Sequence, residues 1–206
     1  MIVLDNIGDR STFHTNEKFS IDLTWDVEIL WLDDMDLMAF YLARDGSMGG
    51  VFSSEYGHRK KDYEGSLFEF PYIRFCNYSP ITECENSERI YVQNMQWVDE
   101  INIVAVEYDL AVGDGSQYKP QESMHIFGDD SKSEKELEKI ELSLYNNDFA
   151  ICVPMTIEKS KITSNPVLLI ARLTQKNEEI VCERINEYMT VENAYNNIPG
   201  FKQICY

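Results

Sequence analysis

The chain has 206 residues, of which 44% are hydrophobic and 12% aromatic, so it can bury a core and is not a disordered tail. Its formal net charge of -18 argues against nucleic acid as a partner, because phosphate contacts need clusters of Lys and Arg. No stretch approaches the roughly 18 apolar residues of a membrane span, and the N-terminus lacks a signal-peptide pattern. We therefore expect a single acidic domain over residues 1–206, located in the cytoplasm.

The cysteines give no sign of a structural framework. They are five in number and scattered, and no C-x-x-C or Cys/His ligand spacing occurs among Cys76, Cys84, Cys152, Cys182 and Cys205. The sequence therefore predicts neither a zinc site nor a set of disulfides, and a reducing compartment fits this usage.

The first clear element is a strand at Phe19–Trp25, after a leading segment with a short strand at 2–4. Phe19, Ile21, Leu23 and Trp25 alternate with Ser20, Asp22 and Thr24. A period of two with one polar side is typical of a half-buried strand, so we expect the apolar set to face the core.

A cluster of acids precedes the next strand, Leu37–Leu42, which ends at an Asp45-Gly46 turn. Residues two apart in an extended chain share a face and lie roughly 6.6 Å apart, so Asp34 and Asp36 should point the same way. A hard cation such as Ca2+ could bridge this pair of carboxylates. The simpler alternative is a solvated acidic surface at the start of the strand.

The middle of the chain contains further short strands. Val51-Phe52 and Ile90–Val92 are two of them, while Pro71 confines the 67–75 segment to a sheet edge or a strand end. Ile101–Tyr108 lacks a polar face, as Leu37–Leu42 does. We expect both of these strands to be central in their sheet.

The last third adds strands at Phe149–Ile157, Val167–Leu173 and Ile180–Cys182, and a short helix at Glu192–Asn197. The 131–144 segment is ambiguous, and we interpret it as a turn or short helical piece leading into a strand at 139–145. Some ten short strands without βα alternation predict an all-β fold, an antiparallel two-sheet β-sandwich with one or two short helices.

The order of these motifs resembles the TerD/TerA family of bacterial tellurite-resistance and stress-response proteins over roughly residues 19–175. The resemblance is carried by a W-D element, a D-x-D before an apolar strand and a D-G turn, a G-V-F strand, a P-Y-I element and an acidic loop closing on a strand. In this chain these are Trp25-Asp26, Asp34-Met35-Asp36, Asp45-Gly46, Gly50-Val51-Phe52, Pro71-Tyr72-Ile73 and Glu83–Val92.

The resemblance implies a calcium-binding β-sandwich without enzymatic activity, acting as a scaffold or interaction module with protein partners. It makes Asp34 and Asp36 the primary Ca2+ ligands, with Glu85 and Glu88 approaching from the second acidic loop. Four carboxylates, completed by carbonyls and waters, could supply the 6–8 oxygens that Ca2+ takes.

Two departures from the family pattern keep a metal-free interaction module open as the alternative. The family usually has a G-D pair after the P-Y-I element, where this chain has Asn77-Tyr78. Its G-D-D-E run appears here as Glu85-Asn86-Ser87-Glu88.

A third hypothesis is a hydrolase, because paired carboxylates can act as acid and base. Acids so crowded and so close to a turn are more typical of a metal cradle or a wet surface. None of the three histidines stands beside a Ser or Cys in a nucleophile motif, so we expect no enzyme. Six aromatic residues outside the clear strands could line a ligand surface, but we expect most in the core or at its rim: Trp31, Tyr56, Tyr63, Tyr72, Tyr78 and Trp97.

Overall fold

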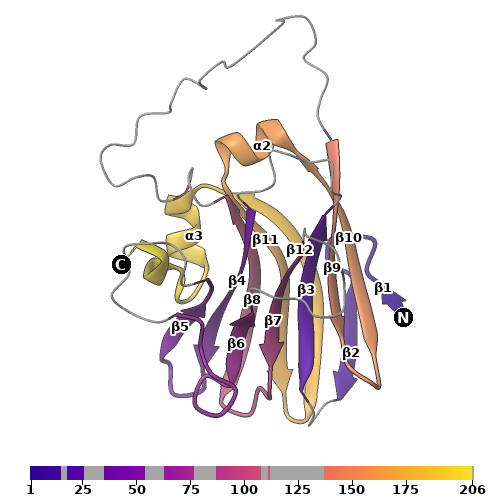
Figure 1. Ribbon diagram of the computed structural model, residues 1–206, viewed down its shortest axis with the longest axis vertical. Helices are drawn as coiled ribbons and strands as arrows, with labels where there is room; N and C mark the ends of the chain where they lie inside the picture. Colours follow the sequence, from indigo (N-terminus) through magenta and orange to yellow (C-terminus); the bar gives the residue numbers. More distant parts are fainter. Residues whose placement is uncertain are drawn as a thin grey trace, which may run out of the picture.

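A computed structural model describes residues 1–14, 18–25, 35–53, 63–76, 87–107, 111 and 137–205. These residues form two six-stranded sheets packed face to face (Figure 1). The described part also contains two short helices and one 3-10 helix. The predicted fold class, an all-β two-sheet sandwich, is confirmed.

The first sheet is antiparallel except at one edge, where a two-residue strand pairs parallel to its neighbour. In spatial order its strands are β1 (Ile2–Val3), β10 (Ala150–Glu158), β9 (Leu137–Tyr145), β3 (Phe19–Trp25), β7 (Ser87–Val92) and β6 (Ile73–Cys76). Pro71 lies just before edge strand β6, as the sequence predicts, because a proline has no N–H for a sheet ladder.

The second sheet is antiparallel throughout. In spatial order its strands are β2 (Arg10–His14), β12 (Glu179–Met189), β11 (Val167–Lys176), β8 (Val98–Glu107), β4 (Met35–Ala43) and β5 (Met48–Val51). The two strands predicted to be central, β4 and β8, lie side by side inside this sheet.

Three short helical elements complete the described fold. Helix α2 (Lys159–Ser164) connects β10 of the first sheet to β11 of the second, while α3 (Val191–Asn197) and η1 (Phe201–Cys205) follow β12 (Figure 1). The predicted helix at 192–197 is thus confirmed, whereas α2 was not predicted. None of the described helices is long and apolar enough to cross a membrane.

Helix η1 is fastened to the edge of the second sheet. The Gln203 side chain accepts a hydrogen bond from the Gly50 N–H at 2.8 Å and donates one to the Met48 carbonyl at 3.2 Å. Gly200 has φ +84°, and a Cβ at this position would lie 2.3 Å from the Gly49 carbonyl oxygen. A glycine is therefore required here, both for its left-handed backbone and for the close approach to β5.

The inner core fills the space between the sheets. Phe19, Ile21 and Leu23 are almost completely buried in it, and Trp25 packs partly buried at its margin, as predicted. The polar side of β3 is buried as well, because Ser20 and Asp22 have exposed fractions of only 9% and 6%. Period-two alternation alone therefore did not identify β3 as a strand covered on both faces.

An outer core lies on the other side of the second sheet, beneath α3 and η1. It explains why β4 and β8 have no polar face. Its buried members are Met38, Phe40, Phe52, Tyr63, Val104, Val106, Ala111, Val167, Leu169, Met189, Ala194, Ile198, Phe201 and Ile204.

An irregularity in β11 distributes its side chains between the two cores. The pairing register with β8 shifts between Leu169 and Ala171. Val167 and Leu169 lie in the outer core, whereas the consecutive residues Ile170 and Ala171 both lie in the inner core. One extra residue therefore changes the phase of the strand, as a β-bulge does.

Next to this irregularity, where Arg172 of β11 pairs with Asn102 of β8, the outer side of the second sheet carries a small polar cluster. Asn102 is completely buried and donates a hydrogen bond to Glu100 Oε1 at 2.7 Å. Its Oδ1 accepts one from Arg172 Nε at 3.0 Å, so the side-chain amide is paired at both ends.

Two strands differ from the sequence-based prediction. Strand β2 was missed, because only Phe13 among its five residues is a large apolar side chain. Strand β12 runs over Glu179–Met189 rather than Ile180–Cys182, because the inward position after Cys182 is taken by Arg184, a charge that ends the apolar alternation. Among the six aromatics, Tyr63 is buried and Tyr72 is partly buried, as expected for most of the set, whereas Trp97 is 55% exposed. Trp31, Tyr56 and Tyr78 lie outside the described residues.

Candidate functional site

Two of the four predicted Ca2+ ligands belong to the described part of the chain. Asp36 is the second residue of β4, and Glu88 is the second residue of β7. Asp34 and Glu85 lie outside the described residues, as do Asn77 and Tyr78. The expected shared face of Asp34 and Asp36 therefore remains a prediction.

Glu88 crosses from the first sheet to the second. Its Oε2 accepts a hydrogen bond from the backbone N–H of Leu37, the residue that follows Asp36. Strand β5 pairs with β4 only from Ala39 onward, so among the described residues the first four positions of β4 have a sheet neighbour on one side only. A carboxylate satisfies an amide that the sheet leaves unpaired, and the bond is charge-assisted.

The described residues offer the type of oxygen ligand that Ca2+ prefers, but too few of them to complete its coordination shell. Carboxylate oxygens are the ligands that Ca2+ prefers, and it takes 6–8 oxygens. In the described ranges, no group of three or more His, Cys, Asp or Glu side chains is placed to hold a metal ion. Asp36 and Glu88 alone would leave most of the coordination shell to other residues and water.

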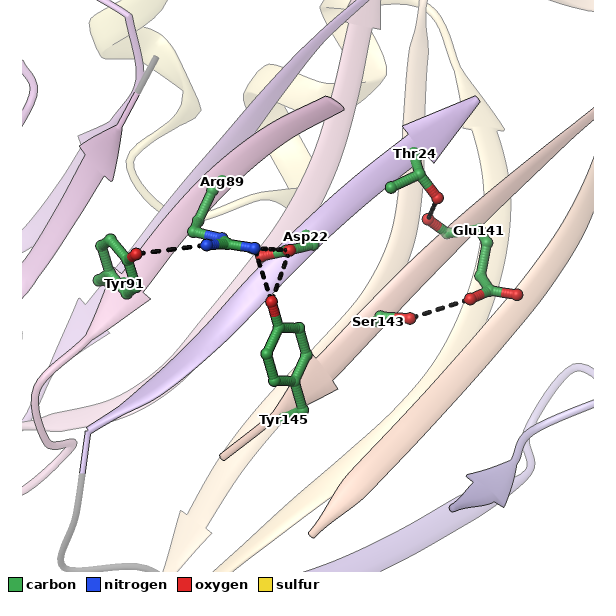
Figure 2. A network of polar contacts seen from close by, with 7 residues as sticks. All are labelled: Asp22, Thr24, Arg89, Tyr91, Glu141, Ser143 and Tyr145. Atoms are coloured by element: carbon green, nitrogen blue, oxygen red, sulfur yellow. Dashed lines mark hydrogen bonds and ion pairs between the residues drawn. The ribbon is translucent and has the colours of Figure 1, made fainter. Parts of the chain in front are cut away.

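A second polar site occupies the outer side of the first sheet, where β3 lies between β7 and β9 (Figure 2). The Arg89 guanidinium binds the Asp22 carboxylate with two nitrogens, Nε at 2.7 Å from Oδ1 and Nη2 against Oδ2. Arg89 is only 1% exposed. A buried bidentate pair of this kind needs further partners for its remaining polar atoms.

Two tyrosines supply those partners. Tyr145 Oη donates a hydrogen bond to Asp22 Oδ2 at 2.9 Å and accepts one from Arg89 Nη2 at 2.6 Å. Tyr91 Oη accepts from Arg89 Nη1 at 3.3 Å, and Lys18 Nζ lies 3.6 Å from the centre of the Tyr91 ring. Figure 2 shows both hydroxyls pointing toward the ion pair.

The electrostatics of this cluster favour a fixed charge state. The hydrogen bond to Asp22 raises the pKa of Arg89 above its ordinary value. Burial, followed by the hydrogen bond to Asp22, raises the pKa of Tyr145. Arg89 thus stays charged and Tyr145 stays protonated near neutral pH, so neither is suited to proton transfer there. We interpret the cluster as structural.

The sequence-based search missed this cluster, although a weak signal for it exists. Arg89 and Tyr91 alternate with Ile90 and Val92, which places the arginine on the face opposite the core. A charged residue beside apolar strand residues suggests a buried partner, but Asp22 stands 67 positions away. Spacing within one strand cannot identify such a partner.

Comparisons with known proteins add no assignment. No protein-family model matches the chain, and no curated protein matches it significantly. Any function must therefore be argued from its own residues.

Proposed function

We propose that this protein is a non-enzymatic interaction module that binds Ca2+ at the end of the sandwich where β4 and β7 begin. The hydrogen bond from the Leu37 N–H to Glu88 is the observation that carries the proposal. It brings Glu88 to the residue next to Asp36, although 51 positions separate Glu88 from Leu37. Asp36 points to the other side of β4 from Leu37, so an ion bound by both acids lies at the end of the strands, where the two sides meet.

The remaining predicted ligands stand next to these strands in the sequence. Asp34 directly precedes β4, and Glu85 comes two residues before β7. If the fold brings these carboxylates together, they repel one another, and the net charge of -18 adds to the repulsion. A bound divalent cation would attract these carboxylates and so replace their mutual repulsion by a favourable interaction.

The resemblance to the TerD/TerA family supplies the setting of the proposal: a bacterial stress response of the tellurite-resistance type, in the cytoplasm, with protein partners. The overall acidity makes nucleic acid a poor partner.

A metal-free module is the second candidate, and the same contact supports it. Glu88 already has a structural task, because it joins the two sheets through the Leu37 amide. If this is its only task, the acids of this end are a solvated surface and the protein binds partners without calcium.

Thermal unfolding with and without Ca2+ separates the two candidates, because a ligand that binds only the folded state raises its stability. We expect Ca2+ at several millimolar to raise the melting temperature of the wild type, and Mg2+ to do so less. Replacement of both Asp34 and Asp36 by Asn should abolish the rise and leave the protein no less stable in chelator.

Glu88→Gln sharpens this test, because the amide oxygen still accepts the Leu37 hydrogen bond but the charge is lost. It should retain the stability of the wild type in chelator and lose most of the response to Ca2+. The control is Glu178→Gln, an exposed acid in the turn before β12 with the same change of charge. A wild-type melting temperature that Ca2+ leaves unchanged would decide for the metal-free module.

A further inference from the structure

Arg184 is a buried cation with too few partners. It faces inward from β12 and is 7% exposed. Its Nη1 donates a hydrogen bond to the Leu4 carbonyl at 2.6 Å. In the described part of the chain, neither Nε nor Nη2 meets an acceptor, and no carboxylate lies within ion-pair distance. A charge removed from water normally requires an opposite charge nearby, so this arrangement is costly as it stands.

A hollow of about 560 Å³ lies beside Arg184. It is open to solvent and spans three neighbouring rows of the first sheet, across β3, β9 and β10, and its volume lies in the range of small-molecule sites. It is lined by Thr24, Trp25, Lys139, Ile140, Glu141, Pro154, Met155, Thr156 and Arg184.

The same hollow has a second unpaired donor. Trp25 Nε1 is buried, and no hydrogen-bond acceptor for it exists in the described structure. Trp25 comes from the first sheet and Arg184 from the second, so two residues that each carry a buried N–H without a partner line the same hollow. Buried donors without acceptors are rare in folded proteins, and two beside one hollow indicate an oxygen-bearing ligand.

The charges around the hollow favour a single negative charge. Arg184 brings one positive charge to the inner side of the hollow, where Ile140 and Met155 lie. Lys139 and Glu141, which also border it, are exposed on the other face of β9, and their opposite charges offset each other there. The Glu141 carboxylate accepts a hydrogen bond from the Ser143 hydroxyl at 3.0 Å (Figure 2). A monoanion matches the single positive charge of Arg184, whereas a doubly charged anion would leave one of its charges without a partner.

The rest of the lining is apolar. Ile140, Met155 and Pro154 border the hollow together with the Trp25 ring. A ligand that fits these walls has a short hydrocarbon part attached to its charged group, because burial of apolar area adds to the affinity.

We propose that this hollow is a binding site for a small organic monocarboxylate with an apolar chain. Its carboxylate lies on the Nε–Nη2 edge of Arg184, the edge that the Leu4 bond leaves unused, and its chain lies against Ile140 and Met155. Nε is shielded from water in the structure, whereas Nη2 is not, so two-point binding follows a small rotation of the guanidinium. The site uses none of the proposed Ca2+ ligands and is independent of that function.

The first test is a titration of the wild-type protein with hexanoate, followed by the indole N–H signals in a ¹⁵N–¹H spectrum. Trp25→Phe identifies the signal of Trp25. We expect a saturable shift of this signal with hexanoate at millimolar concentration, and little change with hexanol or inorganic phosphate. An unmoved Trp25 signal overturns the proposal. An equal response to hexanol or to phosphate overturns the carboxylate assignment.

The second test uses variants of the cation. Arg184→Gln should weaken hexanoate binding at least about tenfold, because a charge-assisted bond is lost. Arg184→Met should also lose binding while its melting temperature without hexanoate stays equal to or above that of the wild type. The matched control Arg74→Gln removes an exposed arginine from β6, at the other edge of the first sheet, and should bind normally. Unchanged binding in Arg184→Gln overturns the proposal.

Discussion

The outer sides of the two sheets are closed in opposite ways. The second sheet presents apolar side chains outward and covers them with α3 and η1, so that the Phe40 ring packs at a tilt against Phe201 with ring centres 5.0 Å apart. The first sheet buries an ion pair, Asp22 with Arg89, between two tyrosine hydroxyls. One side is closed by packing and the other by charge pairing.

The comparison teaches that burial on both faces of a strand does not require an apolar sequence. Strand β8 shows its burial in its composition, while β3 looks half-exposed and yet keeps Asp22 at 6% exposure. The two sides should therefore lose stability in different ways when a residue is substituted. A packed cover loses stability in proportion to the volume removed, whereas a paired charge fails when one partner is left alone.

The largest effect is expected on the packed side. Phe201 is completely buried between Phe40 and Tyr195, so Phe201→Ala leaves a cavity under η1. We expect it to lower the free energy of unfolding by on the order of 4 kcal/mol. Urea unfolding measures this loss. Phe68→Ala, at a residue that is 88% exposed, is the control and should change little.

The charged side should respond next. Arg89→Met leaves the Asp22 carboxylate buried without its cation, and we expect a loss of about 3 kcal/mol. The distinguishing result is its recovery: the double variant with Asp22→Leu should regain most of that loss, because no uncompensated charge is then buried. No second substitution of this kind would restore Phe201→Ala. A double variant as unstable as Arg89→Met would contradict the contrast between the two sides.

A smaller loss of stability is expected from substitution of Tyr145, whose hydroxyl hydrogen-bonds to both Asp22 and Arg89. Tyr145→Phe removes the donor to Asp22 and the acceptor for Arg89 Nη2 without changing the ring. We expect a loss of about 1.5 kcal/mol, the scale of a hydrogen bond to a charged group. Tyr91→Phe, which removes the longer 3.3 Å contact, should cost less in the same unfolding experiment.

The smallest effect at neutral pH is expected from the thiol between the sheets. Burial raises the pKa of Cys182 to about 12. The protonated thiol therefore contributes fully to the free energy of unfolding at pH values below about 8.5, the ordinary pKa of a cysteine in the unfolded chain. As the pH rises from there toward 12, this contribution falls by about 1.4 kcal/mol per pH unit. Cys182→Ala should show a shallower loss of stability between pH 8.5 and 10 than the wild type. Equal slopes would exclude this thiol as a source of the alkaline sensitivity.

Much of the fold was predictable, because the side chains that decide it lie close together in the sequence. The runs around Phe40 and Val104 have no polar face, and the structure places both strands inside the second sheet. The helix at 191–197 begins at Thr190, whose side chain accepts a hydrogen bond from the Asn193 N–H, a local signal that the sequence displays.

The polar sites were not predictable, because their partners are distant in the sequence. Glu88 was chosen as a metal ligand from a family pattern, but its bond to the Leu37 amide depends on how two sheets meet. Arg184 interrupts an apolar alternation and so shortened the predicted strand, although it lies inside β12. Which charges are buried together is decided by tertiary packing, and one strand at a time does not display it.

The bond between Asn102 and Arg172 has a consequence for the uniqueness of the fold. Residues 167–171 of β11 are apolar on both faces. A shift of this part by one residue along β8 would therefore exchange one apolar side chain for another at little cost. The same shift in the part of β11 that follows Ala171 would instead carry Arg172 into the inner core and separate it from Asn102. The Asn102 side chain, together with the ion pair between Arg172 and Glu100, therefore favours one alignment of β11 with β8 over a slip by one residue.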